Sequence, residues 1–195
     1  MNRRYRRLRP WELAPRPTVS EPRPVLIEAV LDFVRDARLC PGVTRIALIG
    51  SLTTHKPIPK DADVVVTLDD DVDWERLAKL GRQLKGRTQR INLGADIFLA
   101  NAAGHYIGRV CGYRECHARV LCQAHHCGER QHLNDDFHLI TLTAETIRDA
   151  PFELWPRVER RGPAPEDVEQ LLLVKLEGDA SQPEPRPLAQ DQSLG

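Results

Sequence analysis

Two short segments rich in β-branched residues constrain the fold more than any other feature of the chain. Residues 43–49 and 62–68 are mostly apolar and bounded by polar or Gly/Pro residues, which indicates two strands, each buried on at least one face. Gly50 and Ser51 directly follow the first segment, and Asp61 and Asp63 mark the start of the second. The sequence therefore predicts a strand, a Gly-Ser turn, a loop, and a second strand that opens with two acidic residues.

Helical patterns flank these two strands. Apolar residues recur at helical spacing over 25–37 and again over 74–84, where Gly86 is expected to end the helix. A later helix is expected over 165–177, with Pro165 in its first turn. Further strands are expected over 88–93, 95–100 and 137–143. This order of elements predicts an α/β or α+β fold in which helices flank one mixed sheet.

Length and composition fit one compact domain with appendages. The chain has 195 residues, 41% of them hydrophobic, which is enough to bury a core. We expect a basic, proline-rich lead over 1–24 that is not helical inside, a domain over 25–176 with its core over 25–100, and a disordered tail over 177–195. The 28 Lys and Arg residues balance the 28 Asp and Glu residues, so the chain as a whole has no basic charge that would attract nucleic acid. The arginine-rich first nine residues are either a solvated tail or a nucleic-acid contact.

The sequence also bears on location. No apolar run approaches the ~20 residues that a membrane-spanning helix needs, and the arginine-rich N-terminal residues are not followed by the apolar stretch of a secretory signal. We therefore expect a cytoplasmic protein that does not span a membrane and whose five cysteines are reduced.

The acidic pair suits a divalent cation. Residues i and i+2 of a strand project to the same face, so Asp61 and Asp63 would hold two carboxylates side by side. Mg²⁺ takes one or two protein carboxylates and completes its shell with water and substrate phosphates. Gly50 lets the backbone approach a phosphate, and Ser51 offers a hydroxyl and an N–H. Asp96, between apolar neighbours, is a candidate third ligand and proton acceptor; the alternative for Asp61 is a turn residue at a strand start.

This arrangement resembles the DNA polymerase beta superfamily of nucleotidyltransferases, in particular its minimal members, over about residues 25–100. The resemblance implies that Asp61 and Asp63 bind two Mg²⁺ ions and that Gly50 and Ser51 hold a nucleoside triphosphate. It also implies that Asp96 matches the third acid of the family. A nucleoside monophosphate would then pass to a hydroxyl with release of pyrophosphate.

The loop after the Gly-Ser turn departs from the family pattern. Minimal members usually have a short basic or small-residue stretch there, whereas residues 52–60 contain two stiffening prolines. Lys60, the last residue of this loop, is also expected to bind the nucleotide. Neither the Walker nor the Rossmann glycine motif is present in the sequence. The acceptor could be a protein, an RNA or a small molecule; the alternative is a catalytically silent, antitoxin-like or partner-binding protein that keeps the fold.

Four of the five cysteines lie within seventeen residues, in a Cys/His-rich segment over 105–135. Thiolates in a tetrahedral array select Zn²⁺, and a closed site of this kind can fold a polar loop. We therefore expect a structural zinc-binding insertion, in which His126 could replace Cys127 as a ligand. The alternatives are free thiols and a redox or catalytic role. The expected ligands are Cys111, Cys116, Cys122 and Cys127.

Overall fold

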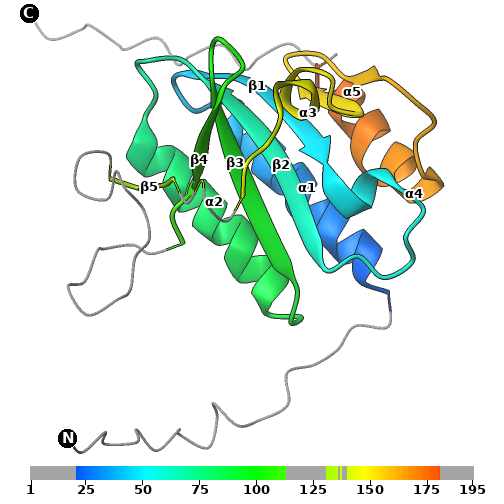
Figure 1. Ribbon diagram of the computed structural model, residues 1–195. Coiled ribbons are helices and arrows are strands. Elements are labelled where there is room, and N and C mark those ends of the chain that lie inside the picture. Colours follow the sequence, from blue (N-terminus) through cyan, green and yellow to red (C-terminus); the bar gives the residue numbers. More distant parts are fainter. Residues whose placement is uncertain (1–20, 113–130, 136, 138–139, 181–195) are drawn as a thin grey trace, which may run out of the picture.

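A computed structural model describes residues 21–112, 131–135, 137 and 140–180 (Figure 1). In this described part, seven strands form one mixed sheet with the order β5-β4-β3-β2-β1-β6-β7. Within it, β2 and β3 are the one parallel pair and the other pairs are antiparallel. The mixed α/β class predicted from the sequence is confirmed. The strands are β1 (Val43–Ile49), β2 (Asp61–Leu68), β3 (Gly94–Asn101), β4 (Tyr106–Val110), β5 (Leu133–Asn134), β6 (Phe152–Trp155) and β7 (Glu159–Arg160).

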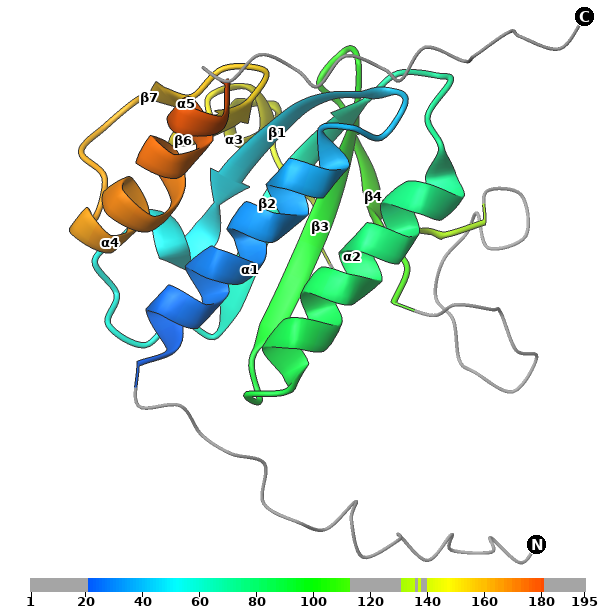
Figure 2. The same cartoon turned by 180° about the vertical axis from the view of Figure 1, so that it is seen from behind.

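Two long helices cover one face of the sheet (Figure 2). These are α1 (Pro22–Ala37) and α2 (Trp74–Gln89), and each turns an apolar side toward the strands. The main core lies between these helices and the sheet, and it includes the fully buried residues Leu26, Val30, Ile46, Val64 and Leu99.

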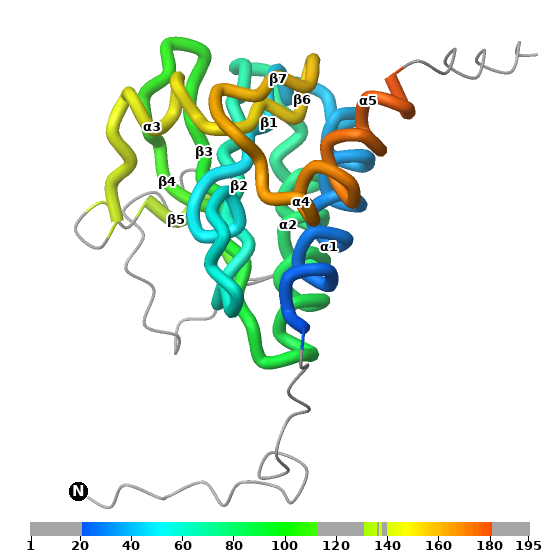
Figure 3. The backbone as a smooth tube through the Cα atoms, turned by 90° about the vertical axis from the view of Figure 1, so that its right-hand side faces the viewer, coloured from blue at the N-terminus to red at the C-terminus, as the bar shows by residue number. Residues whose placement is uncertain are grey.

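The C-terminal part of the chain adds to both faces. Helix α3 (Ala144–Arg148) lies with a second, smaller apolar cluster on the face away from α1 and α2. A helical segment packs beside α1 (Figure 3). It comprises α4 (Glu166–Val168), a π-helical turn (Glu169–Leu173) and α5 (Val174–Ala180). The face away from α1 and α2 therefore has one end that no long helix of the described chain covers.

Two expectations around the second helix are wrong. Gly86 lies inside α2, and residues 88–93 do not form a strand, since α2 continues to Gln89. Thr88 is fully buried, and its hydroxyl donates to the carbonyl of Lys85 at 3.0 Å, which satisfies it within the helix. Burial of the helix face has outweighed the β-branched composition of this segment.

Other boundaries also differ from expectation. The described residues of the predicted strand over 137–143 contain no strand, and Thr143 instead caps α3 by accepting a hydrogen bond from the Thr146 N–H at 3.2 Å. Pro22 and Pro24 lie in the first turn of α1, where a missing N–H costs no helical hydrogen bond. Helix α5 continues to residue 180, past the expected start of the tail at 177. Among the described helices, none is long and apolar enough to cross a membrane.

Candidate functional site

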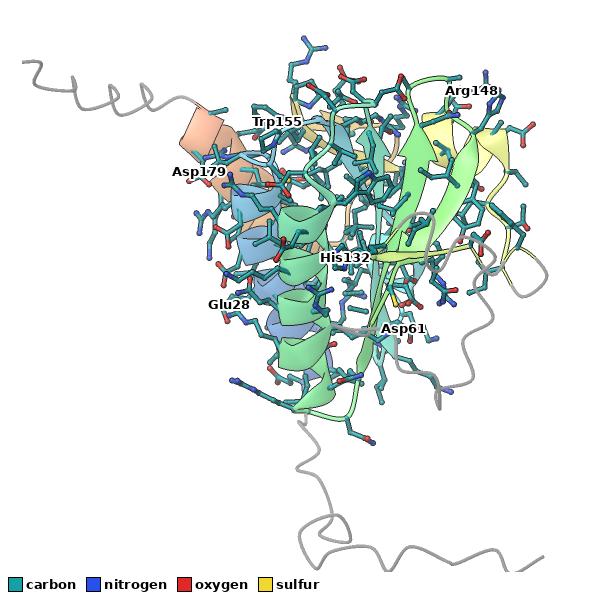
Figure 4. All side chains as sticks on the ribbon, turned by 90° about the vertical axis from the view of Figure 1, so that its left-hand side faces the viewer. Glu28, Asp61, His132, Arg148, Trp155 and Asp179 are labelled. Atoms are coloured by element: carbon teal, nitrogen blue, oxygen red, sulfur yellow. The ribbon has the colours of Figure 1, made fainter. Side chains whose placement is uncertain are left out.

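The strand pairing brings three carboxylates onto one face of the sheet. Asp63 lies beside Asp96 in the parallel β2–β3 pair and beside Ile49 in the antiparallel β1–β2 pair. Directly paired residues project to the same face, and Asp61 shares the face of Asp63 at i−2. Ile49 belongs to the apolar cluster on the face away from α1 and α2. The three carboxylates therefore lie on this face near one end of the sheet, where Figure 4 labels Asp61.

Gly50 brings the backbone directly against this acidic group. Its φ of 72° lies in the left-handed region that L side chains rarely adopt. A Cβ at Gly50 would lie 2.4 Å from Oδ2 of Asp63, so only a glycine allows this approach. The chain then enters a 3₁₀ turn (Gly50–Thr53), in which the Ser51 hydroxyl donates to the carbonyl of Asp61 at 3.4 Å. The structure thus brings Gly50 and Ser51 to the acidic pair.

Lys60 lies next to the site in sequence, but its side chain is exposed. Its carbonyl accepts a hydrogen bond from the Gly94 N–H at 2.8 Å, which joins the starts of β2 and β3. The described contacts of Lys60 are thus contacts of its backbone, and they hold the two acid-bearing strands in register.

Asp63 has a strongly perturbed pKa. Burial, then the neighbouring carboxylates of Asp61 and Asp96, raise its pKa from 3.8 to about 7, and Arg109 acts in the opposite direction. Near neutral pH the ionised form of Asp63 is therefore costly. A bound cation would relieve this cost, and a perturbed carboxyl of this kind is typical of functional sites.

Two basic side chains contact Asp96, and neither was predicted from the sequence. Nη1 of Arg109, on β4, lies 3.1 Å from Oδ1 of Asp96, and Nζ of Lys85, on α2, lies 3.7 Å from the same atom. Neither residue belongs to a local motif with Asp96. Arg109 could have been found only from the pairing of Phe98 with Arg109 that places β4 beside β3.

Asp61, Asp63 and Asp96 are the candidate ligands for a divalent cation. Among the described residues, no group of three or more His, Cys, Asp or Glu side chains is arranged to hold a metal as it stands. Mg²⁺ needs only one or two protein carboxylates, however, and Asp61 and Asp63 share a face. Because Asp63 is costly to ionise alone, the donor set fits a divalent cation. Asp96 would join it only by exchanging its contacts with Arg109 and Lys85.

The expected zinc site falls mostly outside the described residues. Cys116, Cys122, Cys127 and His126 lie there, so the zinc site stays a prediction. Cys111, the first expected ligand, directly follows β4 and is buried. Its N–H donates to the carbonyl of His132 at 2.7 Å, which continues the β4–β5 pairing by one residue.

Replacing Gly50 with Ala should destabilise the protein by about 2 kcal/mol, since left-handed backbone alone costs an L residue roughly 1–2 kcal/mol and the new Cβ would displace the Asp63 carboxylate. Chemical denaturation measures the loss. Gly86→Ala is the matched control: Gly86 is helical, with no atom within 4 Å of an added Cβ. It should stabilise by about 0.5–1 kcal/mol. Equal effects of both substitutions would contradict the close approach at Gly50.

Comparison with known proteins gives a family but no activity. A model described as a family of unknown function, DUF6932, matches residues 11–142. No curated protein and no solved structure matches the chain. The matched range contains Gly50, Asp61, Asp63, Asp96 and Arg109, so the whole acidic site lies within it.

Proposed function

The chain belongs to the DUF6932 family, and we propose that it is a Mg²⁺-dependent nucleotidyltransferase that resembles the minimal members of the DNA polymerase beta superfamily. It would transfer a nucleoside monophosphate from a triphosphate to a hydroxyl of an acceptor, which could be a protein, an RNA or a small molecule. One observation carries the proposal. A glycine with positive φ lies against Asp63, on the sheet face that also bears Asp61 and Asp96.

The residues divide the work of this reaction. Asp61 and Asp63 would hold Mg²⁺, and we expect two Mg²⁺ ions when the substrate is bound. Bound Mg²⁺ would neutralise the charge of the triphosphate. Gly50 leaves room for a phosphate at the backbone, and Ser51 can turn its hydroxyl from the Asp61 carbonyl to a phosphate oxygen. The acceptor oxygen forms a bond to the α-phosphorus, the bond to pyrophosphate breaks, and Asp96 accepts the hydroxyl proton.

A second candidate function rests on the basic residues around Asp96. Arg109 and Lys85 already place positive charge within 4 Å of this carboxylate, so the protein itself supplies part of what a metal would supply. A chain that had lost turnover could keep this arrangement as a structural ion pair. This favours a catalytically silent, antitoxin-like or partner-binding protein as the alternative.

A labelling experiment distinguishes the two functions. The purified full chain is incubated with Mg²⁺, cell lysate and each α-³²P-labelled nucleoside triphosphate in turn. We expect one labelled species that disappears when EDTA replaces Mg²⁺, and its chemistry identifies the acceptor. The Asp61→Ala protein is the control and should label nothing. Absence of labelling with all four triphosphates would contradict transfer and support the silent alternative.

We also propose that the protein is cytoplasmic and that it holds one structural Zn²⁺. Four cysteines lie within seventeen residues, and the cytoplasm disfavours disulfides, so these thiols suit a metal site. Metal analysis of protein made without a polyhistidine tag should find about one Zn²⁺ per chain, since four ligands complete one tetrahedral site. Removing it should lower the melting temperature. Cys116→Ser should have the same effect as removal of the Zn²⁺. Cys40 is buried and lies far from the cluster in sequence, so Cys40→Ser should keep the metal. Metal-free protein of unchanged stability would contradict the zinc site.

A further inference from the structure

Arg23 joins the start of α1 to the backbone between β1 and β2. We call residues 50–60, which link these strands, the Gly-Ser loop. Nη1 of Arg23 donates to the carbonyls of Thr54 and Lys56, each at 2.9 Å, and Nη2 donates to the carbonyl of Leu52 at 3.3 Å. One guanidinium thus binds three carbonyls of a loop that is distant from it in sequence.

Asp167 holds this guanidinium from the opposite side. Nε of Arg23 lies 2.5 Å from Oδ2 of Asp167 and Nη2 lies 2.9 Å from Oδ1, a two-point contact between α1 and α4. The Arg23 side chain is 11% exposed, so solvent has limited access to its contact with Asp167. A guanidinium can make all these contacts at once because its donors form a rigid planar fork, whereas a lysine ammonium cannot.

Hydrogen bonds within the Gly-Ser loop connect the Arg23 contacts to the candidate site. The Thr53 hydroxyl donates to the Gly50 carbonyl at 2.8 Å, and the Thr54 hydroxyl donates to the Ser51 carbonyl at 2.9 Å. Leu52 is fully buried and anchors the middle of the turn. Movement of the loop at its Arg23 contacts would therefore shift Gly50 and Ser51.

We propose that Arg23 and Asp167 are positioning residues, which fix the Gly-Ser loop so that the backbone at Gly50 and Ser51 is preorganised for a nucleoside triphosphate. This inference rests on the proposed function. It also gives the C-terminal helical segment, which lies beyond the matched family range, a role at the site. Preorganisation matters because ordering a loop on binding would weaken the affinity.

The chain offers a matched control for this ion pair. Arg35 and Asp179 also join α1 to the C-terminal helical segment through a two-point contact, at 2.7 and 3.1 Å. In both pairs the partners are 144 residues apart. Among the described residues, the hydrogen bonds of Arg35 reach Asp179 and not the Gly-Ser loop. Loss of this pair removes the same type of link without touching the site.

The experiment compares Arg23→Gln, Arg23→Lys and Asp167→Asn with Arg35→Gln in the full chain. The first readout is hydrogen exchange of the amides over 50–56 without nucleotide, and the second is the affinity for each nucleoside triphosphate with Mg²⁺. Arg23→Gln should speed exchange and weaken triphosphate binding, each about tenfold, as expected for loss of about 1.4 kcal/mol of positioning interactions. Arg23→Lys should not restore either, and Asp167→Asn, which keeps the loop contacts, should give a smaller effect. Arg35→Gln should leave both readouts unchanged.

Two results separate the two ideas. If Arg23→Gln and Arg35→Gln change loop exchange equally, the positioning role is wrong, whatever the protein binds. If the wild-type protein binds no triphosphate, the proposed function is wrong and Arg23 cannot preorganise a triphosphate site, although faster exchange in Arg23→Gln alone would still show that it orders the loop. Should Arg23→Gln fail to fold, Asp167→Asn carries the same comparison.

Discussion

Asp63→Asn should reduce Mg²⁺-dependent transfer to background, because the substitution removes a carboxylate that would bind the metal directly. Asp61→Ala should do the same. The measurement is the rate of labelling at pH 8 under saturating triphosphate. Asp71→Asn, an exposed acid after β2, is the control and should keep full activity. Retention of more than about a tenth of the wild-type rate, which is a loss under ~1.4 kcal/mol in the barrier, would contradict the metal assignment.

The same substitution should not destabilise the fold. Burial and two neighbouring acids raise the pKa of Asp63 from 3.8 to about 7, so above pH 7 the folded protein carries a charge that the unfolded chain tolerates better. This difference corresponds to at most roughly 4 kcal/mol. Asn carries no charge, so urea denaturation at pH 8 should show an equal or higher free energy of unfolding. A clear decrease would show that the carboxylate makes contacts that an amide cannot replace.

The central strands could be predicted because each is a short run of mostly apolar residues in the sequence, which by itself indicates a buried strand. Strands β1, β2 and β3 are short and mostly apolar, β1 and β2 are also rich in β-branched residues, and the observed bounds of all three lie within a residue of those expected. The shared face of Asp61 and Asp63 followed from the strand period alone. Strands β4 to β7 were not predicted, because each spans only two to five residues, which is too short to show a clear alternation of apolar and polar residues.

The basic partners of the site could not be predicted because they depend on tertiary contacts. Arg109 reaches Asp96 through the pairing of β4 with β3, and Lys85 reaches it from α2. Arg23 and Asp167 are 144 residues apart, and no local pattern links them. Local sequence thus predicted the carboxylates on each strand, whereas the residues that balance their charge follow from the packing of whole elements.

The affinity for Mg²⁺ with triphosphate should rise steeply with pH and then level off near pH 7. Metal ligands must be deprotonated, and the pKa of Asp63 is raised to about 7, mainly by burial. Each pH unit below 7 should therefore weaken binding by about tenfold, or roughly thirtyfold between pH 8 and pH 5.5. Calorimetry at several pH values measures this. Affinity that stays constant over the range would show that Asp63 is not a ligand.

Without metal, the contribution of Asp63 to the free energy of unfolding should decrease as pH rises, whereas the affinity for Mg²⁺ should increase. These opposite trends distinguish protonation of Asp63 from a general loss of stability in acid. A raised pKa means that the folded state binds the proton more tightly than the unfolded state, so the contribution of Asp63 is fully present below about pH 4 and is lost by about pH 7. Asp63→Asn should abolish this contribution. Arg109 lowers the pKa of Asp63, so Arg109→Gln should move the midpoints of both wild-type profiles to higher pH. A shift to lower pH would contradict the electrostatic coupling between β4 and the acidic pair.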